Sequence, residues 1–184
     1  LIFILLKSIT FSQDFFLEKK LHNNWEFQKK GDKKWYTVTV PGCVHTDLMD
    51  NGIINDPYYR LNESKAQWVD KEDWVYKSTC SLKGNEYKKQ HHEIKFEGLD
   101  TYAKVVLNGH LILQTNNAFN PYEFNVTEIL QPQNTLEVTL YSPDAIEAEA
   151  ALKLGYTLPE GPRVFSRKPQ FQYGWDWGPK IKTM

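Results

Sequence analysis

The sequence has few cysteines, and this shortage excludes two kinds of small scaffold. Two cysteines, Cys43 and Cys80, among 184 residues are too few for a disulfide framework. No histidines stand beside them at the spacing of a zinc finger, so a structural zinc site is excluded as well. The two thiols either pair with each other or stay free, and we favour buried free thiols.

An excess of charge is also missing. Lysine and arginine total 22 against 23 for aspartate and glutamate, which gives a formal net charge of −1. Because a protein that binds the phosphate backbone needs clustered positive charge, a nucleic-acid partner is excluded. The chain lacks the glycine-rich nucleotide loops, the HExxH zinc motif and the GxSxG nucleophile motif. We therefore predict no cofactor and no metal.

Long apolar runs are absent beyond the start of the chain, so no membrane span of about 20 apolar residues is predicted. The opening run at residues 1–6 is followed by small side chains at alternate positions up to Ser12, a pattern like a signal-peptidase site. We expect residues 1–12 to be a partial signal peptide, with an apolar strand as the alternative. The sequons that begin at Asn62 and Asn125 permit N-glycosylation.

Aromatic residues are abundant, at 14% of the chain, and lie in runs rich in Val, Ile and Thr, as in packed strands. Alternating patterns predict strands at 35–40, 74–82, 91–99, 122–126 and 135–141. Asn108-Gly109 between two apolar runs predicts a two-residue hairpin, because both positions need positive φ. A helical turn is expected at 44–49, and a helix capped by Ser142 is expected to run to Gly155.

This series of short strands with one or two short helices predicts an all-β fold, an antiparallel sandwich of the jelly-roll kind. The proline-rich stretch at 157–169 is expected to be a long loop. Long loops on rigid sandwiches often carry function.

An aromatic segment, FQYGWDWGP at 171–179, follows that loop directly. On an extended backbone its four rings would share one face, as in a strand that buries them in the core. Gly174 and the pair Gly178-Pro179 weaken and end such a strand, so a loop is favoured. Arg167 and Gln170, just before it, would add polar contacts or hold the loop in place, and we favour the holding role for Arg167.

Two indoles beside one carboxylate suit a sugar site. An aromatic face covers the apolar C–H surface of a pyranose, and a carboxylate accepts charge-assisted hydrogen bonds from neighbouring hydroxyls. Trp175, Asp176 and Trp177 supply this combination.

Several blocks of the sequence, in family order, resemble the amino-terminal domain of the β-mannosidases. This family belongs to the glycoside hydrolase group that also contains bacterial β-galactosidase and β-glucuronidase. The blocks are PGCVHTDL at 41–48, NGIINDPYYR at 51–60, NE at 62–63, Trp68, WVY at 74–76, FEGLDT at 96–101, LNG at 107–109 and RKPQFQYGWDWGP at 167–179.

The resemblance implies an exo-acting enzyme, lysosomal or secreted, that removes terminal non-reducing β-mannose from glycoprotein-derived oligosaccharides. It implies a galactose-binding-domain-like jelly roll over residues 13–184 that lacks its closing C-terminal strand and packs, in the whole protein, on a (β/α)8 barrel. The barrel carries two glutamates of a retaining mechanism. Neither glutamate, nor the immunoglobulin-like domain, is expected in this chain.

By the same resemblance Trp175, Asp176 and Trp177 contact the mannose, and none of them is catalytic. Two other functions stay open. The first is a stand-alone, non-catalytic carbohydrate-binding module, because sandwiches often bind sugars without hydrolysing them. The second is a structural domain without a ligand, in which the aromatic segment belongs to the core.

Overall fold

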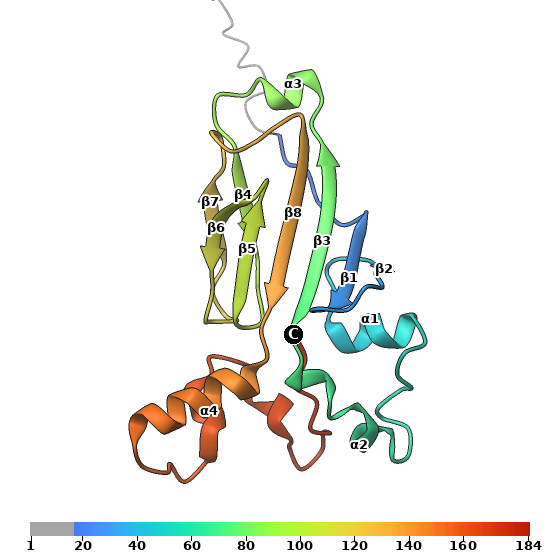
Figure 1. The fold of residues 1–184 in the computed structure, drawn as a ribbon, viewed down its shortest axis with the longest axis vertical. Coiled ribbons are helices and arrows are strands. Elements are labelled where there is room, and N and C mark those ends of the chain that lie inside the picture. Colours follow the sequence, from blue (N-terminus) through green and yellow to red (C-terminus); the bar gives the residue numbers. More distant parts are fainter. Residues whose placement is uncertain (1–16) are drawn as a thin grey trace, which may run out of the picture.

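The computed structural model describes residues 17–184, so the predicted signal peptide lies outside the described residues. Six strands form one antiparallel sheet in the order β2-β1-β3-β8-β5-β6, and two more pair as β4-β7. The predicted all-β class is confirmed. The strands, which Figure 1 labels, are β1 Trp25–Lys29, β2 Tyr36–Val38, β3 Trp74–Ser81, β4 Glu93–Phe96, β5 Ala103–Leu107, β6 His110–Gln114, β7 Tyr122–Asn125 and β8 Gln133–Leu140.

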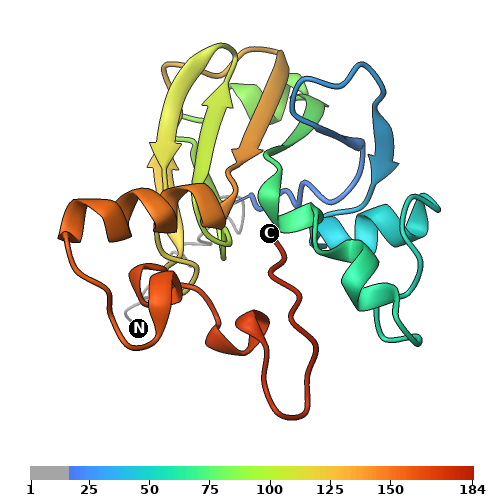
Figure 2. The same ribbon diagram turned by 60° about the horizontal axis from the view of Figure 1, so that its bottom comes forward.

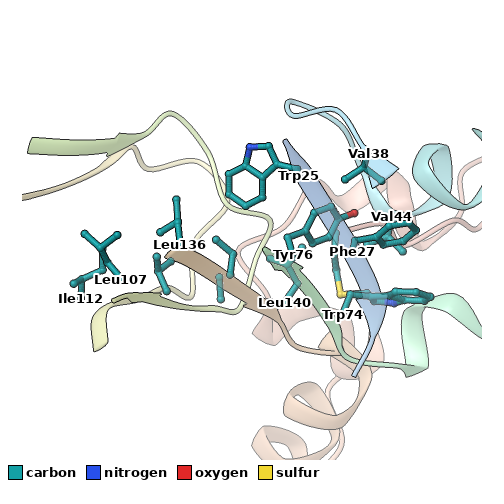
Figure 3. Packing of buried hydrophobic residues seen from close by; sticks show 14 of the residues in the cluster. Trp25, Phe27, Val38, Val44, Trp74, Tyr76, Leu107, Ile112, Leu136 and Leu140 are labelled. Carbon is teal, nitrogen blue, oxygen red and sulfur yellow. The ribbon is translucent and has the colours of Figure 1, made fainter. Parts of the chain in front are cut away.

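The core lies on one face of the larger sheet, where alternate residues of neighbouring strands line up. Phe27, Tyr76, Val138 and Val105 occupy paired positions on β1, β3, β8 and β5, and all four are buried. The Phe27 ring centroid lies 5.4 Å from that of Tyr76. Figure 3 shows aromatic and aliphatic side chains of the core, Phe27 and Tyr76 among them, packed along the sheet. The period-2 pattern of the strands thus places one hydrophobic row across four strands.

The smaller sheet closes the sandwich. Ile94 and Phe96 alternate along β4 and pack against the core cluster, and Val126, just after β7, is buried within it. Two antiparallel sheets that share one apolar interior are the architecture that the sequence predicts.

Two local predictions are confirmed at their turns. Asn108 and Gly109 have φ values of 51° and 84° and join β5 to β6 as a two-residue hairpin. Helix α4, Pro143–Leu154, ends at Gly155 with φ 78°. Ser142 precedes this helix as predicted, but its hydroxyl does not cap the helix. It donates instead to the carbonyl of Asp70 at 2.7 Å.

Other short elements lie among the described residues. Helix α1, Val44–Asp50, matches the predicted helical turn, whereas strand β1 was not predicted. The other short helices were not predicted either. They are α2 Asn62–Ala66, α3 Gly84–Tyr87 and the 3-10 turns η2 Val69–Lys71, η3 Gly161–Phe165 and η4 Gln170–Tyr173. None of the helices at residues 17–184 is long and apolar enough to cross a membrane.

The helices are unevenly distributed. Helices α1, α2 and α4 gather at one end of the sandwich, and α3 lies at the other end (Figure 1). Figure 2 turns the helical end forward and shows the segment after α4 looping out beyond the sheets before it returns to the C-terminus. This part of the chain contains the aromatic segment at 171–179.

Candidate functional site

The aromatic segment ends in a tight turn that displays Asp176 and Trp177. The backbone N–H of Trp175 donates to the carbonyl of Gly178, and the N–H of Gly178 donates back to the carbonyl of Trp175, both at 3.2 Å. These two bonds form an isolated antiparallel bridge. Asp176 and Trp177 therefore occupy the two central positions of the turn, and both side chains are exposed.

The extended conformation considered for this segment is wrong, and the loop is confirmed. Gln170–Tyr173 form the 3-10 turn η4, and Gly174 has φ 101°, a value that favours glycine. Because the backbone turns twice, the four rings do not share one face. Tyr173 points inward and donates its hydroxyl to Glu147, whereas Phe171, Trp175 and Trp177 are 52%, 51% and 74% exposed. A core role for these three rings is therefore wrong.

The three exposed rings form a chain of neighbouring rings at the turn that carries Asp176. The ring centroids of Trp175 and Trp177 are 6.4 Å apart at an interplanar angle of 49°, and Phe171 lies 6.4 Å from Trp177 at 30°. Asp176 stands between the two indoles in the chain. An apolar surface of this kind beside a carboxylate matches the amphipathic faces of a pyranose.

The chain enters the turn through residues 168–174, the first stem of the loop, and leaves it through residues 179–183, the second stem. Lys168 anchors the first stem. Its side chain is fully buried, and its ammonium lies 2.8 Å from Oδ1 of Asp100 and donates to the carbonyl of Thr183. Burial lowers the pKa of Lys168, and the Asp100 carboxylate opposes this shift. Gln172 joins the same group, because Nε2 donates to Oδ2 of Asp100 at 3.1 Å and Oε1 accepts from the Thr183 N–H at 3.0 Å.

Lys182 anchors the second stem. Its ammonium lies 3.1 Å from Oδ2 of Asp70, donates to Asp144 at the start of α4, and stands 5.4 Å from the Tyr173 ring centroid. Only 4% of the Lys182 side chain is exposed. The charge of this lysine is therefore compensated inside the protein.

Glu147 of α4 ties the loop to that helix. One carboxylate oxygen accepts from the Ser166 hydroxyl at 2.5 Å and from the Tyr173 hydroxyl. Burial raises the pKa of Glu147, and the two hydroxyls oppose this shift. The same burial, together with Glu147, raises the pKa of Tyr173.

The residues before the aromatic segment help to hold the loop, Arg167 through its backbone and Gln170 through its side chain. The carbonyl of Arg167 accepts from the Ala118 N–H at 2.9 Å, while its side chain is exposed. Gln170 Nε2 donates to the carbonyl of Lys168 at 3.2 Å. The holding role predicted for the Arg167 side chain stays a prediction, because the contact of Arg167 uses its backbone carbonyl. For Gln170, whose role the sequence left open, the side-chain contact favours holding the loop. Most of 157–169 is irregular apart from η3, as expected for a loop.

The two cysteines are free and half-buried rather than buried. Cys43 precedes α1, where its sulfur lies 3.4 Å from the Thr46 hydroxyl, and burial raises the pKa of the Cys80 thiol. No group of three or more His, Cys, Asp or Glu side chains in the described part of the chain is arranged to hold a metal ion.

The residues that fix the loop were not found from the sequence. They are Asp100, Glu147, Lys168, Gln172 and Lys182, which meet partners far away in the chain or on the opposite stem of the loop. No local period marks such contacts. The sequence offers one signal for these residues, namely that polar side chains stand next to an aromatic run. That signal does not tell whether the polar side chains are buried or exposed.

Comparisons with known proteins agree with this architecture. Residues 25–184 match the family described as the glycosyl hydrolase 2 galactose-binding domain-like family. The chain is 34% identical over 174 residues to β-mannosidase of Bos taurus and 37% identical over 172 residues to β-mannosidase B of Thermothelomyces thermophilus. Each alignment covers 89% of this chain and 20% of the relative.

The fold is also similar to a solved structure. The crystal structure of β-D-mannosidase from Dictyoglomus thermophilum superposes with a TM-score of 0.86 and 45% identity, over 90% of this chain and 21% of that chain. The chain thus spans about a fifth of the length of these relatives. The sequence match and the sandwich fold show that the chain belongs to the glycosyl hydrolase 2 galactose-binding domain-like family, and the relatives to which it is similar are β-mannosidases.

Proposed function

We propose that this chain is the amino-terminal, substrate-binding domain of a retaining exo-β-mannosidase, and that the turn at Trp175–Gly178 contacts the terminal mannose. The observation that carries the proposal is an exposed tryptophan–aspartate–tryptophan turn on a loop whose two stems are held by buried lysines. A rigid support beneath exposed rings is what a binding surface requires.

Each residue of the turn has a distinct role. Asp176 accepts hydrogen bonds from two neighbouring hydroxyls of the sugar, which a carboxylate can do with both oxygens. Trp175 and Trp177 form the apolar wall of the pocket against the C–H face of the ring. None of the three takes part in bond cleavage.

Hydrolysis belongs to two glutamates on a (β/α)8 barrel, outside these 184 residues. Retention of configuration needs two carboxyl groups about 5 Å apart, one as nucleophile and one as acid/base. The exposed turn packs against the mouth of that barrel, which completes the pocket.

The reaction is tested on the protein translated from the complete transcript. We expect it to hydrolyse an aryl β-mannoside and to release β-mannose first, as followed by proton NMR of the anomeric signal. Release of α-mannose first, or activity only on β-glucosides or β-galactosides, contradicts the proposal.

The natural substrates we propose are glycoprotein-derived oligosaccharides with terminal β-mannose, and the compartment is the lysosome or the cell exterior. The mammalian and fungal relatives named above support the enzyme class, and the two sequons are compatible with the secretory pathway.

The structure distinguishes the two sequons. Asn125 is exposed at the end of β7, where its Oδ1 accepts from the Thr127 N–H at 3.0 Å. Asn62 is half-buried at the start of α2, and its Nδ2 donates to the carbonyl of Asp56 at 3.0 Å. A glycan on Asn62 would replace one of the two hydrogens on an amide nitrogen that is already engaged with the backbone at a half-buried position, whereas one on Asn125 would extend into solvent.

We therefore expect glycosylation at Asn125 and not at Asn62 when the protein is made in a secretory host. Peptide mass spectrometry before and after treatment with an N-glycosidase locates the glycan. Asn125→Gln should abolish the mass shift, and Asn62→Gln should leave it unchanged. A glycan found on Asn62 contradicts this assignment.

A non-catalytic carbohydrate-binding module is the second candidate, because the Trp177 ring is accessible within this chain. The transcript separates the two functions. An open reading frame that continues into a barrel with two strand-end glutamates supports the enzyme, and a stop codon directly after Met184 supports the binding module.

A further inference from the structure

We propose that Asp100, Lys168 and Gln172 form a clamp that positions the sugar-binding turn, and that they are positioning residues for the proposed function. Asp100 comes from the connection between β4 and β5, so the clamp joins the loop to the sandwich itself. The proposal rests on the sugar-binding role of Trp175–Trp177 and assigns the residues that set its geometry.

The clamp is a closed ring of hydrogen bonds. The two oxygens of Asp100 bind different partners, Lys168 at 2.8 Å and Gln172 at 3.1 Å. These two side chains then bind the backbone of Thr183, Lys168 at the carbonyl and Gln172 at the N–H, the latter at 3.0 Å. Both backbone polar groups of Thr183, on the second stem, are thus bound by side chains of the first stem.

This ring takes the place of a β-ladder where the chain forms none. The turn at Trp175–Gly178 has its own pair of backbone hydrogen bonds, but the stems below it are not paired as strands. Near Gly174 the two stems approach closely, since a Cβ added there would lie 3.5 Å from the Cβ of Lys180. The clamp closes the loop at its base and so reduces the conformations available to its tip.

The clamp is buried, so a mismatched hydrogen bond in it is costly. Lys168 is 1% exposed and Gln172 is 7% exposed. Two donors or two acceptors that face each other reduce the free energy of unfolding more in a buried site than at the surface, because no water is at hand to satisfy them. Because Gln172 is followed at once by Tyr173 and Gly174, a displaced Gln172 shifts the start of the turn.

The polarity of the ring allows a reciprocal exchange. Gln172→Glu alone places a carboxylate against the carboxylate of Asp100. Asp100→Asn alone places an amide donor against the Gln172 donor, and turning Gln172 over only moves the mismatch to the Thr183 N–H. The double variant Asp100→Asn/Gln172→Glu restores every bond, because the introduced amide donates to the introduced carboxylate, which still accepts from the Thr183 N–H. It also preserves the net charge around Lys168.

The test uses the complete protein and two readouts at a temperature where all variants are folded. The first readout is the dissociation constant of methyl β-mannoside, measured by tryptophan fluorescence. The second is hydrogen exchange of the peptide that covers residues 174–183. Gln114→Glu, at an exposed end of β6, is the matched control for the glutamine substitution.

We expect each single variant to weaken mannoside binding by about tenfold and to accelerate exchange, with recovery to within about threefold in the double variant. Recovery is the result that a merely destabilising effect of either substitution would not produce. Two equal losses that simply add in the double variant overturn the clamp. So does unchanged binding in single variants whose exchange is accelerated.

Failure of the proposed function is recognised separately. A natural protein that binds no mannoside contradicts the sugar-binding role. In that case exchange alone decides on the clamp: protection lost in the single variants and regained in the double variant supports it, and protection unchanged in the single variants overturns it.

Discussion

Asp176→Ala is expected to lower kcat/KM for an aryl β-mannoside by at least about 100-fold in the complete protein. The exposed carboxylate at the tip of the turn is proposed to accept two hydrogen bonds from the sugar. A hydrogen bond to a charged group contributes about 1.5–3 kcal/mol, so the loss of two is consistent with this factor. Steady-state kinetics with 4-nitrophenyl β-mannoside measures the change.

Controls separate this effect from misfolding. Asp176 is exposed and belongs to no buried network among residues 17–184, so the melting temperature of the variant should match that of the natural protein. Glu26→Ala removes an exposed carboxylate from β1, far from the turn in the fold, and should leave kcat/KM unchanged. An Asp176→Ala enzyme that keeps a third or more of the natural kcat/KM would refute the assigned role.

Lys182→Met is expected to reduce the free energy of unfolding by about 3–5 kcal/mol and the melting temperature by roughly 10 °C. The Lys182 ammonium lies 3.1 Å from Oδ2 of Asp70, and the other Asp70 oxygen has no hydrogen-bond partner in the described structure. Removal of the lysine therefore leaves a buried carboxylate without a counter-charge. Thermal and urea denaturation of the purified protein measure the loss.

A second substitution identifies the cause of that loss. Lys182→Met/Asp70→Asn removes both charges of the buried pair and should regain more than half of the lost stability. The carboxylate that stays without the lysine is then Asp144, which is 37% exposed and hydrated by solvent. Lys153→Met is the control, since Lys153 pairs with Glu149 on the exposed side of α4 and should change stability by less than about 1 kcal/mol. A Lys182→Met loss no larger than that of Lys153→Met would show that the buried pair does not stabilise the fold.

Local sequence patterns were sufficient for the regular parts of the fold. The hairpin at Asn108-Gly109 was predictable because positive φ at two successive positions is a strong local requirement. The end of α4 at Gly155 follows from the same kind of requirement. Strand β1 also carries a readable signal, since Trp25 and Phe27 alternate with polar residues, yet it was missed because the segment is short.

The candidate site was predictable only in part. The glycines and proline around Trp175–Trp177 indicated a loop, and the indoles and the carboxylate indicated a sugar. The alternation of rings suggested one shared face, but the 3-10 turn at Gln170–Tyr173 sends Tyr173 inward to Glu147. A tertiary hydrogen bond decided that outcome, and no period in the sequence encodes it.

The supporting residues could not be predicted for a related physical reason. Lysines and glutamines are usually exposed, so Lys168 and Gln172 read as solvent-facing residues of a loop. Their burial depends on Asp100, which is 68 and 72 residues away in the sequence. The pairing of Asp100 with Lys168 and Gln172 depends on the tertiary fold, which brings the connection between β4 and β5 next to the loop.

The decisive measurement is kcat/KM for a set of monodeoxy β-mannosides with the natural enzyme and with Asp176→Ala. If Asp176 binds hydroxyls of the terminal mannose, removal of those hydroxyls should cost the natural enzyme about 10- to 100-fold and the variant almost nothing. If every deoxy sugar instead loses the same factor with both proteins, Asp176 does not contact the mannose and the proposed site is wrong.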